Sequence, residues 1–555
     1  MIGVVADPSD RAVIREFFEL FKTPWEFYES GRRYDVLLCA GTPEYLPEAA
    51  NVTLLYSSDV LYCDVANQLE VSGRREATTL ALGESKLPIY GKCLLFQASS
   101  SNLFRLNEEA SGQAALTFYS SQNGRVVRIG YDLFHEIRHL LTFGQPVEFS
   151  GIPTLELHIQ LVRELIISTG VTLAEIPAIP EGYKFTVCLT HDVDHPSIRK
   201  HSWDRTAAGF FYRATVGSLW NFLRHSISLR ELLANLAAAT RLPLVYLGLA
   251  KDFWRDFVHR YQELEKGCCS TYFVIPFQGR RGREGAGLAP AYRAAQYGAD
   301  DIADLIAEMT AGGDEVGLHG IDSWIDSSSG KEELHKIQEL TGAARIGSRM
   351  HWLFSNEKSP ALLEQAGIFY DSTCGYRETV GFRAGTTQAY KPLEAERLLE
   401  LPLHVMDTAL FYPAYLGLTS TEATRVLERL ANFVERFGGC LTINWHDRSL
   451  APERLWHACY RQLLNDLKAR GVWFATATEI VAWFRKRRSV VFEGAATKRG
   501  SSATDGLSDD NDQLPELRLR IYNSPLLQRR SGQHGFVDVS FSQDAVLQMA
   551  SGNGQ

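Results

Sequence analysis

The sequence predicts an α/β protein whose central region, residues 183 to about 488, forms a mainly parallel sheet or barrel. Three observations support this class. Short runs of strand-forming residues alternate with helical stripes throughout the region. Several of the helices open on a proline or a capping residue and end at glycine. Several strand candidates end in aspartate or histidine, at the edge where the loops of such folds converge.

Bulk composition narrows the range of partners. With 555 residues the chain should form two to four domains, and 45% hydrophobic and 22% charged residues are typical of a soluble globular protein. A formal net charge of −9 disfavours nucleic acid or an anionic membrane as the main partner. The most apolar segment, Leu232–Ala250, is interrupted by polar residues and proline, so no membrane span is expected. The oligomeric state is not predicted.

The cysteines and the N-terminus bear on the compartment. Nine cysteines include no C-x-x-C pair, and their apolar neighbours suggest buried thiols of a reducing compartment. Adjacent Cys268 and Cys269 have no partners at ligand spacing, so a metal there is disfavoured. The first residues lack the basic and apolar regions of a signal peptide. We therefore expect a cytoplasmic protein.

Residues 1–175 are predicted to form a separate α/β domain. Gly3–Ala6 is expected to be a strand, an apolar helical stripe follows, and Asp35–Ala40 is a second strand, which together suggest a β-α-β start. No glycine-rich phosphate-binding motif is present. His135 and His139 lie one helical turn apart and could bind a metal, although surface or core histidines are favoured. The role of this domain stays open, with assembly as one alternative.

The central region supplies eight strand candidates and four well-marked helices. One helix runs from Ser359 to Gly367, another from the capping-box residue Thr419 to Gly438, and a third from near Pro452 to before Gly471. The fourth presents Ile302, Leu305, Ile306 and Met309 on one face. The strand candidates are Phe185–Thr190, Thr271–Pro276, Glu315–His319, Ile346–His351, Ile368–Ser372, Leu398–His404, Cys440–His446 and Val472–Ala475.

Three further segments complete the expected organisation. Residues 196–267 form a helical, aromatic insertion between the first two strands, which either covers the cavity mouth or lines a substrate site. Pro177–Gly182 is a linker. Residues 489–515 are expected to be a flexible linker, and residues 516–555 a short C-terminal β segment with strands at Glu516–Tyr522 and Gly535–Phe541.

Ionisable residues gather at the strand ends. Thr190-His191-Asp192-Val193-Asp194-His195 closes the first strand, and so many ionisable groups are costly to bury without partners or a metal. Because alternate residues of a strand share a face, Asp192 and Asp194 can point into one cavity. His319, His351 and His446 end three later strands, so all five groups should meet at one edge.

At these residues the chain resembles the polysaccharide deacetylase family, also called the NodB homology domain or carbohydrate esterase 4. The resemblance covers about residues 183–488 and implies a distorted (β/α) barrel of 7–8 strands. Its first motif, a Thr-x-Asp-Asp or Asp-x-Asp strand end, is matched by Thr190 to Asp194. This implies that Asp192 is the catalytic base and that Asp194 binds a divalent metal, with Zn²⁺ the first choice.

The second motif, His-x₃-His, is altered. His319 matches its first histidine, but Ser323 occupies the place of the second, and a serine hydroxyl is a poor zinc ligand. His351, at the end of the following strand, is the favoured replacement, and Asp322 is the alternative. The alternative that no residue replaces the histidine, so that the site binds metal weakly or not at all, stays open.

The remaining motifs supply the other expected roles. Arg383 lies in a segment similar to the family's Arg-x-Pro-Tyr motif, whose arginine would clamp the base carboxylate and keep it ionised. His446 ends an apolar strand as the family's last histidine does, which implies the general acid. Asp407 lies in the right interval to orient His446 or to serve a structural role.

The resemblance implies a metal-dependent hydrolase that removes an acetyl group from an N-acetylated sugar, or less favourably an O-acetylated one. A glycan precursor of a bacterial surface polysaccharide is the expected substrate. Release of another acyl or formyl group from a small amide is the nearest chemical alternative. Because two motifs are altered, a catalytically weak or inactive glycan-binding module on the same barrel is the rival hypothesis.

Overall fold

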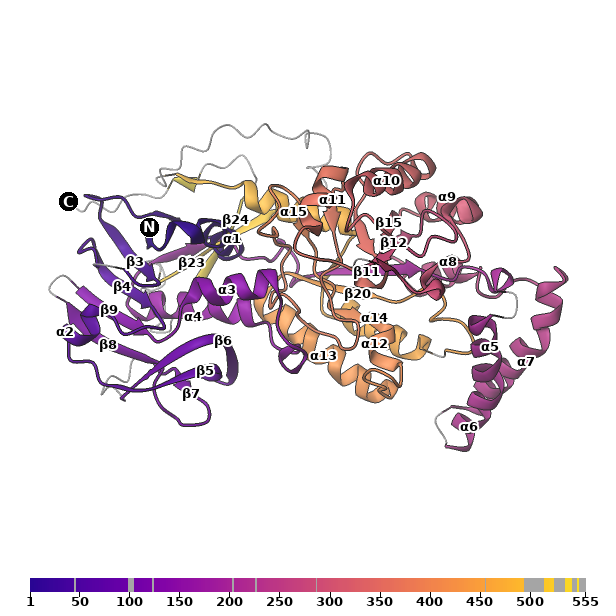
Figure 1. Cartoon of the computed structure of the whole chain (residues 1–555), viewed down its shortest axis with the longest axis horizontal. Helices are drawn as coiled ribbons and strands as arrows, with labels where there is room; N and C mark the ends of the chain where they lie inside the picture. Colours follow the sequence, from indigo (N-terminus) through magenta and orange to yellow (C-terminus); the bar gives the residue numbers. More distant parts are fainter. Residues whose placement is uncertain are drawn as a thin grey trace.

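The structure is a computed structural model of the whole chain. It describes residues 1–43, 46–97, 104–121, 124–201, 204–224, 227–285, 287–454, 456–493, 514–523, 535–541 and 547–548. Figure 1 shows an N-terminal α/β part at one end of the long axis, a second sheet near the middle and a group of helices projecting at the other end. No helix in the described part of the chain combines the length and apolarity needed to cross a bilayer.

The N-terminal part begins with the predicted β-α-β unit. Strands β1 (Ile2–Val5) and β3 (Tyr34–Ala40) pair in parallel, and α1 (Arg11–Phe21) buries its apolar stripe between them and later helices. The sheet has the order β2-β1-β3-β4-β9-β8, with only β8 antiparallel. The sequence did not predict the long antiparallel hairpin of β5 (Val71–Leu82) and β6 (Ser85–Phe96). The other elements are β2 (Trp25–Phe27), β4 (Ala50–Tyr56), α2 (Tyr62–Ala66), β8 (Leu116–Ser121), β9 (Gly124–Ile129), α3 (Leu133–Thr142) and α4 (Thr154–Ser168).

A buried histidine in α4 makes this part sensitive to acid. His158 is fully buried, and its Nδ1 lies 3.1 Å from the Tyr131 hydroxyl. Burial lowers the pKa of His158 to about 3, against about 6.5 in an unfolded chain. Between these values the unfolded chain binds the extra proton, so folding stability falls as the pH drops below about 6.5.

We expect His158→Gln to reduce this acid sensitivity. Between pH 7 and 4.5 the variant should lose about 2–3 kcal/mol less unfolding free energy than the wild type, because glutamine takes up no proton. Urea denaturation at the two pH values measures the difference. Equal losses in the two proteins would show that the pKa of His158 is the same in the folded and unfolded chains.

The second sheet confirms the predicted parallel α/β architecture. Its order is β18-β17-β16-β15-β12-β11-β20-β19, with β21 beside β11, and every pair is parallel. Each of the eight predicted strands contributes, although most are shorter than expected. The bounds are β11 (Thr186–Val193), β12 (Ser270–Val274), β15 (Glu315–Gly320), β16 (Ser348–Met350), β17 (Tyr370–Asp371), β18 (Leu399–Glu400), β19 (Val405–Met406), β20 (Cys440–Asn444) and β21 (Trp473–Phe474).

Helices cover this curled sheet and shield its apolar residues. The predicted capping box of Thr419 and Glu422 is present at the start of α13, and α11 begins and ends where the proline and glycine predict. The helix expected from Pro452 begins later, at His457. The bounds are α9 (Ala303–Ala311), α10 (Ser327–Thr341), α11 (Ser359–Ala366), α12 (Asp407–Phe411), α13 (Ser420–Phe437), α14 (His457–Ala469) and α15 (Ala477–Ser489).

The insertion after β11 is helical, as predicted. Figure 1 shows α5 (Arg205–Tyr212), α6 (Ser218–Leu223) and α7 (Leu229–Tyr246) projecting from the body, with α8 (Phe257–Leu264) returning to the sheet. A π-helical turn, Arg213–Gly217, joins α5 to α6. A small core that includes Phe210, Trp254 and Ala451 attaches these helices to the loop after β20.

The C-terminal segment forms the predicted hairpin and one further contact. Strands β23 (Leu517–Tyr522) and β24 (Phe536–Phe541) are antiparallel, and β10 (Leu173–Glu175) adds a third strand. Residues 177–180, in the expected linker, are buried. Most of the second expected linker, residues 494–513, lies outside the described residues. All nine cysteines carry free thiols, and five are buried.

Candidate functional site

The candidate site forms at one edge of the second sheet. Asp194 follows β11, His319 lies near the end of β15, His351 follows β16, and His446 lies two residues beyond β20. Because these strands are parallel and in register, their carboxyl ends meet at the same edge. The structure therefore brings together the residues that the sequence placed at separate strand ends.

Three ligand-type atoms converge at this edge. Oδ1 of Asp194 lies 3.4 Å from Nε2 of His319 and 3.3 Å from Nδ1 of His351. The two imidazole nitrogens lie 3.1 Å apart. Both histidines are buried, and the Asp194 side chain is about one-fifth exposed. The three atoms form a small triangle.

Backbone carbonyls fix the tautomers of both histidines. Nδ1 of His319 lies 2.9 Å from the carbonyl oxygen of Arg349, and Nε2 of His351 lies 3.2 Å from that of Arg293. A carbonyl oxygen can only accept a hydrogen bond, so each of these nitrogens carries the proton. The remaining nitrogens, which face each other and Asp194, keep their lone pairs for another partner.

The triangle fits a divalent metal ion. Tetrahedral zinc sites have bonds of about 2.0–2.1 Å, which place ligand atoms about 3.3–3.4 Å apart, close to the distances seen here. Oδ1 of Asp194 is buried and has no hydrogen-bond partner among the described residues. Burial lowers the pKa of His351, which favours the neutral form that binds metal. Although burial opposes it, His351 and His319 hold the pKa of Asp194 well below its ordinary value.

Ser323 and Asp322, the other residues considered at the altered motif, point elsewhere. The Ser323 hydroxyl donates a hydrogen bond of 2.5 Å to the buried Glu333 on α10. Oδ1 of Asp322 accepts a hydrogen bond from the backbone nitrogen of Arg283 at 2.8 Å. The geometry thus places His351, rather than Asp322, beside His319 and Asp194.

Asp192 lies on the same strand and is held by two donors. Its Oδ1 accepts a hydrogen bond from Nη1 of Arg349 at 3.0 Å, and its Oδ2 accepts one from Nδ2 of Asn444 at 2.8 Å. Arg349 is fully buried and also donates to Thr190, two residues before Asp192 on the same face of β11. The carboxylate is therefore fixed in one orientation and paired with a cation.

The assignment of this clamp to Arg383 was wrong. Nη1 of Arg383 donates to the carbonyl oxygen of Gly375 at 3.0 Å, and the guanidinium lies 5.8 Å from the Tyr376 ring centroid. Its backbone carbonyl accepts a hydrogen bond from Gln145 of the N-terminal part. Arg383 thus lies where the N-terminal part contacts the second part of the chain. Arg349, a residue of β16, binds the Asp192 carboxylate in its place.

His446 forms a tight pair with Asp407 at the other side of the triangle. Its Nδ1 lies 2.6 Å from Oδ1 of Asp407, whose Oδ2 accepts hydrogen bonds from the His446 backbone and the Ser449 hydroxyl. Nε2 of His446 lies 3.8 Å from Oδ2 of Asp194. Although burial opposes the charged form, the Asp407 carboxylate raises the pKa of His446 to about 10. His446 can therefore hold a proton at neutral pH.

Sequence reasoning missed Arg349 and Asn444. Both signals were available, because Arg349 precedes His351 by two residues and Asn444 precedes His446 by two, and each lies on the strand that leads to that histidine. A search for polar residues two positions before each strand-end histidine would have found them.

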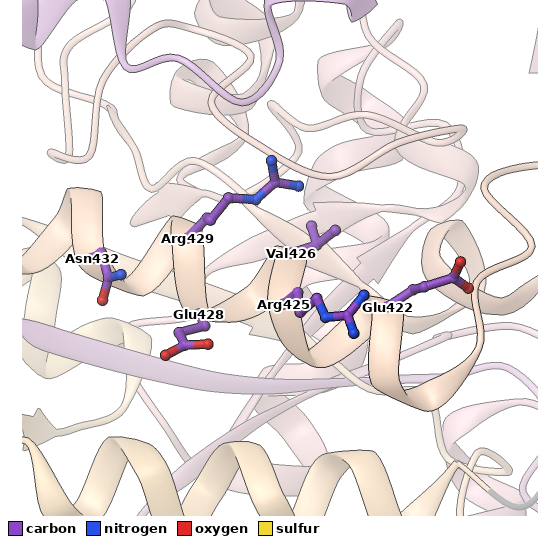
Figure 2. Close-up of a pocket in the computed structure, with 6 residues that line it drawn as sticks. All are labelled: Glu422, Arg425, Val426, Glu428, Arg429 and Asn432. Carbon is purple, nitrogen blue, oxygen red and sulfur yellow. The ribbon is translucent and has the colours of Figure 1, made fainter. Parts of the chain in front are cut away.

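The other residues that the sequence offered as metal ligands do not form a cluster of this kind among the described residues. His135 is exposed, His139 stacks on the Tyr90 ring with centroids 4.7 Å apart, and neither belongs to a cluster of metal-ligand atoms among the described residues. Figure 2 shows the residues that line a separate pocket, all of them on α13. One helix supplies all of its lining, so no second wall could enclose a ligand there.

Comparisons with known proteins give distant likenesses only. No family model and no curated protein matches the chain. Similar solved structures include candidate polysaccharide deacetylases of Mycobacterium smegmatis (19% identity, TM-score 0.35, covering 57% of this chain and 96% of that one) and of Pseudomonas aeruginosa PAO1 (16%, 0.35, 56% and 94%). A family 4 acetyl xylan esterase of Clostridium thermocellum, in complex with cobalt, is 15% identical with a TM-score of 0.25, covering 54% and 91%. At these identities and TM-scores the similarities support no conclusion about function.

Proposed function

We propose that this protein is a metal-dependent hydrolase that removes an acetyl group from an N-acetylated sugar or glycan precursor. The observation that supports it best is the triangle of Asp194, His319 and His351, whose free lone pairs face one another. A fixed carboxylate and a protonated imidazole flank this triangle, and these two groups suit the hydrolysis of an amide.

Asp194, His319 and His351 would hold the metal ion, with Zn²⁺ the first choice. When bound, such an ion polarises an acyl oxygen and lowers the pKa of a water molecule. The two backbone carbonyls that fix the histidine tautomers would keep the ligand atoms in place, because partners of this kind orient metal ligands.

Asp192 is the proposed general base. Arg349 and Asn444 each occupy one lone pair of its two carboxylate oxygens and leave others available. The carboxylate would take a proton from the water molecule that attacks the acetyl carbonyl carbon. The buried Arg349 pairs with this carboxylate and holds it in one orientation.

His446 is the proposed general acid. The C–N bond breaks only if the leaving nitrogen receives a proton, and His446 holds one near the site. Nδ1 is bound to Asp407, so Nε2 is the nitrogen that would donate. Acetate and a free amino sugar are then released, Asp192 gives the proton it gained to the solvent, and His446 takes one back from the solvent.

Metal content and acetate release test the proposal together. Elemental analysis of the purified chain should find about one divalent ion per molecule, and a panel of nucleotide-linked and oligomeric N-acetyl sugars should yield acetate from at least one member. Glycan binding without metal or acetate would instead support the binding-module hypothesis. Metal without acetate release from any N-acetyl or O-acetyl sugar would contradict the proposed substrate class.

Asp407→Asn should shift the alkaline limit of the activity to lower pH. The Asp407 carboxylate raises the pKa of His446, so its loss lowers that pKa, and the acid loses its proton earlier as the pH rises. The rate of acetate release between pH 6 and 10 measures this shift, with metal content as the control. An unchanged pH profile would show that Asp407 has only a structural role.

A further inference from the structure

The projecting helices of the insertion expose an unusual amount of apolar surface. Of the 25 large apolar side chains that are exposed in the described chain, 11 lie on α5, α6, α7, the turn between α5 and α6, and the residues just after α7. Monomeric proteins rarely expose so many apolar side chains in one region, and such a surface usually marks an interaction site. These residues are Phe211, Tyr212, Val216, Leu219, Trp220, Leu223, Leu229, Leu233, Leu244, Leu247 and Leu249.

The exposed residues follow the helical repeat and so form continuous faces. On α6, Leu219 and Trp220 each lie about one helical turn before Leu223, and the exposed fractions of the three are 51%, 54% and 63%. The opposite face of these helices is already used. Ser218 on α6 accepts a hydrogen bond of 2.7 Å from Asn235 on α7, and both side chains are buried.

Positive charge accompanies the apolar residues. From the start of α5 to the end of α7, residues 205–246, the chain has five arginines and one glutamate, a formal charge of +4 in a protein of −9. Arg224, Arg230 and Arg241 are exposed, and Arg224 lies 4.6 Å from the Trp220 ring centroid. Glu231 caps the start of α7 by binding Ser228. The net charge, which disfavours an anionic membrane, conceals this local excess.

We propose that the face of α5, α6 and α7 that bears these residues, the insertion face, docks on an anionic lipid bilayer. Helices with exposed leucines, aromatic residues and arginines lie in the membrane interface, where apolar side chains enter the acyl region and arginines meet lipid phosphates. A second copy of the chain fits less well, because a symmetric dimer would place two surfaces of like charge against each other.

Docking would also tether the domain that carries the candidate site to the lipid surface. The insertion begins directly after Asp194, and its core contacts Ala451 in the loop that follows His446. This consequence rests on the proposed function, whereas binding to the membrane does not.

Vesicle co-sedimentation of the full chain tests the docking. The protein should sediment with vesicles of phosphatidylglycerol and phosphatidylcholine, and much less with phosphatidylcholine alone or at high salt. The triple variant Leu219→Ser, Trp220→Ser, Leu223→Ser should lose about 100-fold or more in affinity, because its apolar anchor is gone. The matched control replaces Val60, Tyr62 and Val65 by serine, since these exposed residues lie at the opposite end of the molecule and should not affect binding (Figure 1).

Arginine variants measure how much of the vesicle affinity is electrostatic. Neutralising Arg224, Arg230 and Arg241 to glutamine should weaken binding about fivefold for each residue at low salt. The same change at three arginines outside the insertion should have little effect; these are Arg74 on β5, Arg138 on α3 and Arg397 before β18. If the wild-type chain stays in solution, or if the serine variant on α6 binds as well as the wild type, the proposal is wrong. Loss of a dimer in that variant, without vesicle binding, would instead identify a second copy as the partner.

Discussion

Replacing His351 by alanine is expected to strip the divalent metal from the site and to abolish acetate release. His351 supplies one of only three protein atoms in the triangle, with Nδ1 at 3.3 Å from Asp194 and 3.1 Å from His319. Loss of a residue that merely supports a ligand costs about 10–100-fold in metal affinity, so loss of the ligand itself should cost more. Elemental analysis and calorimetric titration with Zn²⁺ measure the change.

Asp322→Asn is the matched control for this prediction. Asp322 was the alternative replacement for the missing histidine, yet its carboxylate binds the backbone of Arg283. The variant should therefore keep its metal and its rate. If Asp322→Asn lost the metal and His351→Ala kept it, the assignment of the third ligand would be reversed, and the binding site would have to rearrange from the present geometry.

The strand ends show which part of the site could be predicted from the sequence. Asp192, Asp194, His319, His351 and His446 were all placed at one edge, because parallel strands end together whatever their exact length. The strands themselves are shorter than the apolar runs, as in β17 and β18. Apolar residues continue into the buried loops, so hydrophobicity alone cannot mark where pairing stops.

The clamp on Asp192 shows why the rest could not be predicted. Motif order suggested Arg383, but the distance between an arginine and a carboxylate depends on how separate strands pair. Arg349 reaches Asp192 because β15 and β12 bring β16 and β11 into one curved sheet. The order and register in which distant strands pair cannot be predicted from the local sequence pattern.

Contacts between distant segments were missed for the same reason. The basic run Arg485–Arg488 ends α15, where positive charge complements the helix dipole. Arg488 also forms an ion pair of 2.7 Å with Glu16 on α1, and Arg487 donates to backbone carbonyls of the same N-terminal part. Both side chains are largely buried in this contact. A charge run shows that partners are needed but not which partners the fold supplies.

Replacing His446 by alanine is expected to slow acetate release by about 10²–10⁴-fold, the usual contribution of a positioned acid, while the metal stays bound. The imidazole lies beyond the triangle, with its Nε2 3.8 Å from Asp194, so it is not needed to hold the ion. Its proton is held by the Asp407 carboxylate, which raises the pKa to about 10.

The rate loss should depend on the leaving group, which tests the role itself. A good leaving group needs little protonation, so an activated acetyl ester such as an aryl acetate should be hydrolysed by His446→Ala at a rate much closer to that of the wild type than an N-acetyl sugar is. His351→Ala should lose both activities, because both need the metal. If His446→Ala kept its full rate on the N-acetyl sugar, protonation of the leaving nitrogen would have to come from another group. Equal losses on ester and amide would indicate that His446 acts before the C–N bond breaks, in binding or in activation of the water.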